Sequence, residues 1–125
     1  MRMIVAFVLS AFFLSGCVTP MTKLEVDKAV YQPLPDSYKQ DVQNIISMYL
    51  KDPYSAKFTF FTPIKSYSLP SRHFAYVVPV GVNAKNSYGG YTGYKMHYYA
   101  YYSGRFKDVT QGVNLGDVKW SDEVK

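Results

Sequence analysis

Residues 74–82 read Phe-Ala-Tyr-Val-Val-Pro-Val-Gly-Val, a β-branched and aromatic run that predicts a β-strand. Pro79 has no backbone N–H to give to a neighbouring strand, so it predicts an edge position or a bulge. Working outward, residues 57–62 are rich in Phe and Thr and predict an earlier strand. Downstream, the tyrosine-rich stretch 91–102 is followed by a Ser-Gly turn and by 105–109, which predicts a hairpin.

An amphipathic helix is expected just upstream of these strands. Its apolar residues recur with helical spacing: Tyr38, Val42, Ile45, Ile46, Tyr49 and Leu50. Asp36 or Ser37 can cap its start, and Asp52-Pro53 ends it. A helix followed by consecutive strands with short turns predicts an α+β fold, with one amphipathic helix packed on a small antiparallel β-sheet.

The rest of the chain divides around this domain. We expect a signal segment at 1–16, a flexible tether at 17–35, the α+β domain at 36–110 and a polar, partly ordered tail at 111–125. Prolines in the tether discourage helix and sheet pairing. A weak alternation at 24–27 leaves two possibilities open, a free linker or a short strand added to the sheet edge of a partner.

The N-terminus carries an export pattern. An apolar run begins behind Arg2 and ends in Leu14-Ser15-Gly16-Cys17. The run is too short for a transmembrane helix, which needs about 20 apolar residues. Cleavage by the ordinary signal peptidase, giving a soluble secreted protein, is the other alternative.

This segment resembles the signal of bacterial lipoproteins. The resemblance implies an S-diacylglycerol and an N-acyl group on Cys17, which would hold the chain on a membrane. An Asp after the cysteine often retains such proteins in the inner membrane, and here Val18 follows instead. The resemblance therefore implies the outer membrane, with the domain facing the periplasm.

The net charge and the distribution of basic residues limit the classes of partner that the protein is expected to bind. The net charge is +5, and the basic residues are scattered along the chain rather than gathered in blocks. This balance suits anionic envelope polymers or lipid headgroups, and it does not form the basic patch of a nucleic-acid-binding protein. The chain has one cysteine, so its stability must come from packing and not from disulfides.

Two further segments resemble motifs of small bacterial envelope and phage-associated proteins. Residues 52–58, Asp-Pro-Tyr-Ser-Ala-Lys-Phe, match a DPxSAKF element, and 83–94 match an NAKNSxGGYxGY element. The resemblance implies a shared fold and no particular reaction. A Cys-Gly-Glu often precedes the second element in such proteins. Here Pro79-Val80-Gly81 stands in that place, so no role of that cysteine or glutamate carries over.

The segment 82–94 is expected to be a long hairpin connection. Asn83, Asn86, Gly89 and Gly90 tolerate positive φ and can turn the chain. Three interpretations stay open: a structured turn, a protein-contact loop, or a nest of backbone N–H groups that binds an anion together with lysines at 85 and 95.

Alternation along 91–102 separates two faces that both carry aromatic residues. We expect Tyr94, Met96, Tyr98 and Ala100 to face the core. The exposed row would then contain Tyr91, Lys95, His97, Tyr99 and Tyr101. Such a row suits a protein interface, stacking on sugars or bases, or packing against the chain's own tail.

Nothing in the sequence supports catalysis or a cofactor other than the lipid on Cys17. His73 and His97 are far apart, and no metal-binding or nucleophile motif is present. We predict a non-catalytic protein-interaction or structural component of the envelope. A secretion system or another transenvelope assembly is the setting that we consider for it. The alternative is a lipoprotein that binds peptidoglycan or a small anion. The candidate surface comprises Lys85, Asn86, Tyr88, Gly89, Gly90, Tyr91, Lys95, Tyr99 and Tyr101.

Overall fold

The computed structural model describes residues 19–125. The expected signal segment and the lipid attachment site at Cys17 lie outside the described residues. Within residues 19–125, no helix combines the length and the apolar character needed to cross a membrane.

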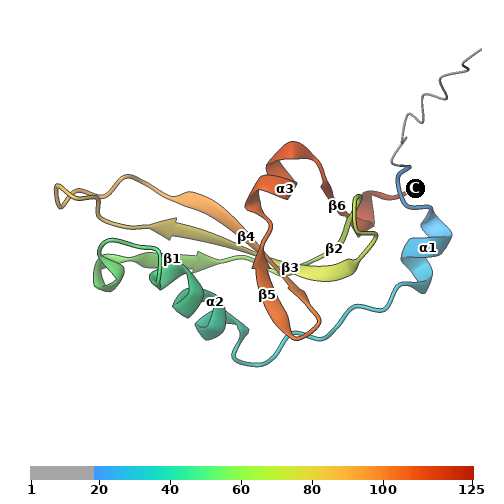
Figure 1. The fold of residues 1–125 in the computed structure, drawn as a ribbon, viewed down its shortest axis with the longest axis horizontal. Helices are drawn as coiled ribbons and strands as arrows, with labels where there is room; N and C mark the ends of the chain where they lie inside the picture. The colour runs from blue at the N-terminus through green and yellow to red at the C-terminus, as the bar shows by residue number, and fades with distance from the viewer. Residues whose placement is uncertain (1–18) are drawn as a thin grey trace, which may run out of the picture.

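The described chain forms a twisted sheet with helices against it (Figure 1). The helices are α1 (Lys23–Lys28), α2 (Tyr38–Ser47) and α3 (Thr110–Leu115), with short 3₁₀ turns η1 (Pro53–Ser55) and η2 (Ser121–Glu123). The strands are β1 (Lys57–Phe60), β2 (Ile64–Ser68), β3 (Phe74–Asn83), β4 (Lys95–Tyr102), β5 (Arg105–Asp108) and β6 (Val118–Trp120).

All strand pairs are antiparallel, so the α+β class with an antiparallel sheet is confirmed. The order is β5-β4-β3-β2-β6, and β1 also pairs with β3. Because β1 opposes Val80–Asn83 and β2 opposes Phe74–Val77, these two strands share one side of β3 end to end. Strand β2 was not expected from the sequence.

Pro79 sits at the break between β1 and β2, not at an edge. β3 has partners on both sides, so the expected edge position is wrong. The Pro79 carbonyl accepts a hydrogen bond from the Phe61 N–H at 3.0 Å, on the side of this break. Since N and C=O of one strand residue face the same side, the missing N–H of Pro79 also faces the break and costs no regular ladder bond.

The main core lies between α2 and one face of the sheet. Val42 and Ile46 of α2 are buried in one cluster with Val80, Val82 and Tyr99. The helix begins after Ser37, whose hydroxyl donates to the Asp41 carboxylate at 2.8 Å. Regular α-helix ends at Ser47, a few residues earlier than the periodicity predicts, and a turn leads on to Leu50.

The chain beyond residue 110 is ordered, contrary to the expected tail. α3 packs near β4 and β6, and β6 pairs with β2 so that Trp120 opposes Ser66. Ser121 is buried. The sequence-based prediction failed because Val118 and Trp120 look isolated in the sequence, and their pairing partners lie some fifty residues away.

The segment expected to be a flexible tether also folds from residue 19 onward. Thr22 and Glu25 form a capping box that starts α1, so residues 24–27 are helical and not an extended strand. Further along, the Tyr31 ring packs on Phe74 and Tyr76 with centroids 5.8 and 5.5 Å away. These contacts fasten the segment to the sheet.

Candidate functional site

The molecule has two distinct ends along its long axis. Helix α1 and the start of the described chain, at residue 19, lie at one end, and the β3–β4 loop lies at the other (Figure 1). We call the second end the distal tip and define it as residues 51–57 and 84–95. The ten-residue strand β3, which runs toward the tip, spans about 33 Å.

The β3–β4 loop holds its own shape. The Asn86 side-chain oxygen accepts hydrogen bonds from the N–H groups of Tyr88 and Gly90, at 2.9 and 3.1 Å. The Asn86 N–H donates to the Gly90 carbonyl at 2.8 Å, and Gly89 adopts a φ of 79°. The structured-turn interpretation is therefore correct for this loop.

The same hydrogen bonds occupy the backbone N–H groups that were expected to form an anion-binding nest. The N–H groups of Asn86, Tyr88, Gly89 and Gly90 all donate within the loop, and the Gly93 N–H donates to the Asn83 side chain at 3.2 Å. No donor of this set is left pointing at a ligand. The turn uses the side-chain oxygen of Asn86, and the place of this residue on the candidate surface stays a prediction.

Side chains tie the loop to the segment that follows α2. Lys51 Nζ donates to Ser87 Oγ at 2.6 Å, and the Tyr91 hydroxyl donates to the Ser55 carbonyl at 2.9 Å. The two motif segments of the sequence thus meet at the distal tip.

Tyr91 is the centre of a cationic cluster. Its ring has Lys57 Nζ at 4.7 Å and Lys85 Nζ at 5.6 Å from the ring centroid. Both distances fall within the range of cation–π attraction. Tyr91 is 43% exposed, so the cluster remains open to solvent.

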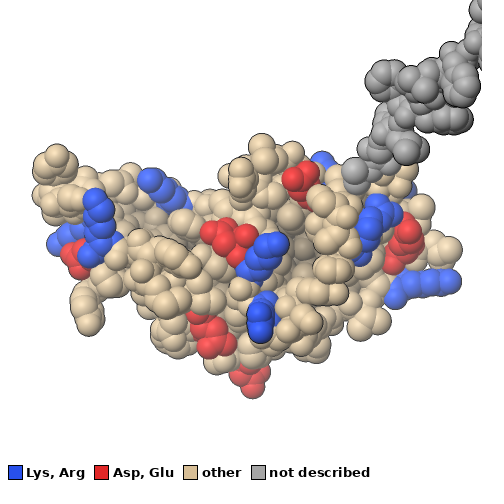
Figure 2. Space-filling view, viewed as in Figure 1, with Lys and Arg blue, Asp and Glu red and all other residues tan. Residues whose placement is uncertain are grey.

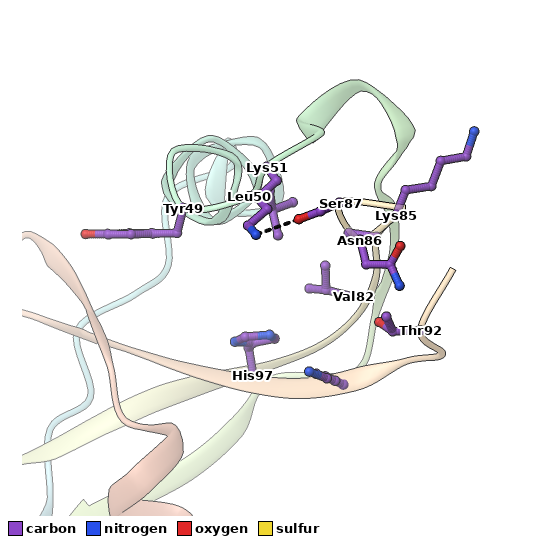
Figure 3. A pocket seen from close by; sticks show the side chains of 11 residues that line it. Tyr49, Leu50, Lys51, Val82, Lys85, Asn86, Ser87, Thr92 and His97 are labelled. Carbon is purple, nitrogen blue, oxygen red and sulfur yellow. Dashed lines mark hydrogen bonds between the residues drawn. The ribbon is translucent and has the colours of Figure 1, made fainter. Parts of the chain in front are cut away.

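A shallow hollow of about 290 Å³ lies beside this cluster, between the end of α2 and the loop (Figure 3). Val82 lies at its floor, and Lys51, Lys95 and His97 contribute polar groups to its lining. Lys85 borders the hollow, but its side chain extends away from it (Figure 3).

The tip has an excess of positive charge. Its residues include Lys51, Lys57, Lys85 and Lys95 against the single acid Asp52. Figure 2, drawn from the same side as Figure 1, shows basic side chains at this end with an acidic side chain among them. The ion pairs formed within residues 19–125 join Lys23 to Asp27 and Arg72 to Glu25, outside the tip. The tip lysines therefore keep their charge available for an external anion.

Aromatic residues of the tip are exposed to an unusual degree. Tyr88 is 97% exposed, Tyr54 is fully exposed and Tyr49, at the border of the tip, is 79% exposed. Isolated apolar groups on a surface are normal, whereas a gathering of aromatic residues indicates a contact surface.

The expected faces of β4 are wrong for three residues, because Tyr99 is buried while Tyr94 and Met96 are exposed. Lys95 is exposed as expected, and Tyr98 and Ala100 are half-buried. Tyr99 is 4% exposed and belongs to the core under α2, while Tyr94 and Met96 are 57% and 39% exposed. Tyr101 is half-buried against Phe106, with centroids 4.7 Å apart. Tyr99 and Tyr101 therefore leave the candidate surface. The cause is the register, which places Tyr99 opposite Val78 on the face that α2 covers.

Burial changes the acidity of Tyr99. Its removal from solvent raises the pKa of the Tyr99 hydroxyl to about 12, with smaller contributions from Asp108 and Tyr49. The side chain is thus a neutral core residue over the physiological pH range.

Sequence reasoning missed Lys51, Tyr54 and Lys57 as members of the tip. All three belong to the conspicuous 51–58 stretch, but only the fold brings Lys51 to Ser87 and Lys57 to Tyr91. Within residues 19–125, no three His, Cys, Asp or Glu side chains are grouped so as to hold a metal ion. No family model, curated protein or solved structure matches this chain.

Proposed function

We propose that this protein is a lipid-anchored envelope component whose distal tip contacts another envelope protein, as a non-catalytic part of an assembly. The lipid would be attached at Cys17, only two residues before the described start of the chain. The observation that carries the proposal is the placement of exposed aromatic side chains and lysines at the end farthest from Thr19.

This arrangement suits a protein held at one end and presented at the other. A lipid on Cys17 would fix the Thr19 end near a membrane, in the outer membrane by the lipobox resemblance. The tip would then project into the periplasm.

The test is isolation of the tagged full chain from gently solubilised envelopes, with measurement of particle mass and of co-purifying proteins. We expect a large particle with a stoichiometric partner, lost in a Tyr54→Ala/Tyr88→Ala double variant. A Leu24→Ala/Val30→Ala variant alters exposed apolar residues at the opposite end and should retain the partner. A particle of monomer size would contradict the proposal.

The lipid anchor has its own test. Mass spectrometry of the mature chain from the membrane fraction should find the diacylglycerol and acyl groups on Cys17, whereas Cys17→Ser should carry neither and should keep its signal segment uncleaved. A mature chain without lipid on Cys17 would contradict the anchoring part of the proposal and leave the tip contact to be judged separately.

A second candidate is binding of an anionic ligand, such as the carboxylates of peptidoglycan peptides. The hollow lined by Lys51, Lys95 and His97 favours it, without help from the backbone of the loop. Titration with muropeptides would give saturable binding that a Lys51→Gln/Lys95→Gln variant loses. Absence of saturable binding in the unaltered chain would exclude this candidate.

A further inference from the structure

The outer edge of β1 is an open edge of the sheet. β1 pairs with β3 alone, and the Phe61 N–H just beyond it still points to β3. Because successive residues of a strand point their backbone groups to opposite sides, those of Phe58 and Phe60 point away from β3. Within residues 19–125, neither residue's backbone forms a hydrogen bond on that side.

An apolar notch of about 270 Å³ opens on the sheet face beside this edge. It is lined by Thr59, Phe61, Gly81, Tyr94 and Met96. Gly81 forms its floor, opposite Thr59 on one side and Met96 on the other. Phe61 is 49% exposed, so with the half-exposed Tyr94 and Met96 it forms walls that lack a cover.

A positively charged side chain lies on the same face of β1 as the notch. Lys57 precedes Thr59 by two residues, so both side chains lie on the same face of β1. Lys57 and Lys85 flank the Tyr91 ring, and neither takes part in an ion pair within the described chain. The apolar notch at Thr59 and the positive charge of Lys57 are therefore separated by two residues along β1.

We infer that β1 accepts an extended segment of a partner protein as an added strand, with a large apolar residue at the notch and an acidic residue two positions away, opposite Lys57. Backbone bonds to Phe58 and Phe60 supply affinity, and the alternate side chains supply specificity. The inference rests on the proposed function for the source of the partner, an envelope protein. It goes further by naming the edge and the chemistry of the bound segment.

The probe is a random nonapeptide library displayed on phage and selected against the full chain in mild detergent. We expect enrichment of sequences with an aromatic or large aliphatic residue two positions from Asp or Glu. In the bound state, amide hydrogen exchange should slow at Phe58 and Phe60. Enrichment of basic sequences, or none at all, would overturn the inference.

Gly81→Ala tests the notch without harming the fold. The added Cβ would lie 3.3 Å from the Tyr94 ring and 3.7 Å from the Met96 sulfur, both of them movable side-chain atoms. We expect at least tenfold weaker binding of the enriched peptide and no loss of folding stability. Unchanged affinity in this variant would overturn the inference.

Lys57→Glu tests the charge. It should weaken the acidic peptide about tenfold, and a peptide with Lys in place of its acidic residue should recover the affinity. A merely structural role of Lys57 would not produce this exchange of preference, so failure of the rescue would overturn the charge assignment.

The remaining outcomes separate the two proposals. If envelope isolation yields a partner that Gly81→Ala retains in full, the envelope function stands and the edge inference fails. If the full chain instead associates with itself in a concentration-dependent way that Gly81→Ala abolishes, the occupant is a second copy and the inference is overturned.

Discussion

The proximal end of the molecule, near Thr19, and the distal tip are stabilised by different kinds of contact. At the proximal end, side chains join segments far apart in the chain. The Tyr31 hydroxyl bonds Ser121, 90 residues away, at 2.6 Å. Arg72 contacts both the Thr19 carbonyl and Glu25.

At the tip, by contrast, the loop closes on itself through Asn86, within four residues. Two side-chain bonds, Lys51 to Ser87 and Tyr91 to Ser55, tie it to the segment that follows α2. The difference indicates that the proximal end depends on contacts between distant segments, while the turn at 86–90 is formed by local bonds. Its outermost side chains are therefore free to contact a partner with little consequence for stability.

The largest expected effect comes from Tyr31→Ala. This change removes ring packing on Phe74 and Tyr76 and the hydrogen bond to Ser121. We expect the free energy of unfolding to fall by about 2–3 kcal/mol. The matched change at the tip, Tyr88→Ala, should alter it by less than about 0.5 kcal/mol. Urea unfolding of both variants measures the contrast, and similar losses would break the comparison.

Tyr99→Phe comes next and concerns the core between α2 and the sheet. Because the folded pKa of Tyr99 is raised to about 12 from 10.0, the unfolded chain releases this proton first as pH rises. Its stabilising contribution is complete below pH 10 and is lost between about pH 10 and 12. Comparison with the unaltered chain should show a shallower alkaline loss of stability in the variant. Equal slopes would contradict the burial of the hydroxyl.

Asn86→Ala should act locally. Loss of the shared acceptor leaves the Tyr88 and Gly90 N–H groups without their partner, so we expect a cost of about 1 kcal/mol. Hydrogen exchange should quicken at these amides and stay unchanged near Tyr31. Asn86→Asp keeps an acceptor oxygen and serves as the control. Faster exchange at both ends would show that the tip is not an independent turn.

The smallest effect is expected from Glu25→Gln in α1. The backbone N–H of Thr22 is the main cause that lowers the pKa of the Glu25 carboxyl below 4.5. A lowered folded pKa means that the carboxylate stabilises at neutral pH and that this contribution is lost as pH falls through the folded value. The variant should lack this part of the acid dependence, with Glu123→Gln as control. Identical acid titrations of unfolding would contradict the capping box.

The sequence predicted the elements better than their faces. The strand at 74–82 and the helix starting at Tyr38 follow from local residue patterns, and both are present. The faces of β4 could not be assigned because both carry aromatic residues. Only the pairing of Tyr99 with Val78, under α2, decides which face is buried.

For the candidate site, too, some features follow from local sequence and others depend on distant contacts. The loop glycines and Asn86 were recognisable as a turn from their conformational preferences. Lys51 and Lys57 belong to the tip through a hydrogen bond to Ser87, 36 residues away, and a cation–π contact with Tyr91, which no local pattern specifies. The order of the tail depends likewise on the distant pairing of β6 with β2.

The most direct test of the two-ended account places a photo-crosslinking amino acid at Tyr88 or at Leu24 of the full chain in living cells. Both positions are well exposed, one at the tip and one in α1. The account predicts a discrete crosslink to one envelope protein from position 88 and none to that protein from position 24. The same product from position 24, or no protein product from position 88, would contradict it.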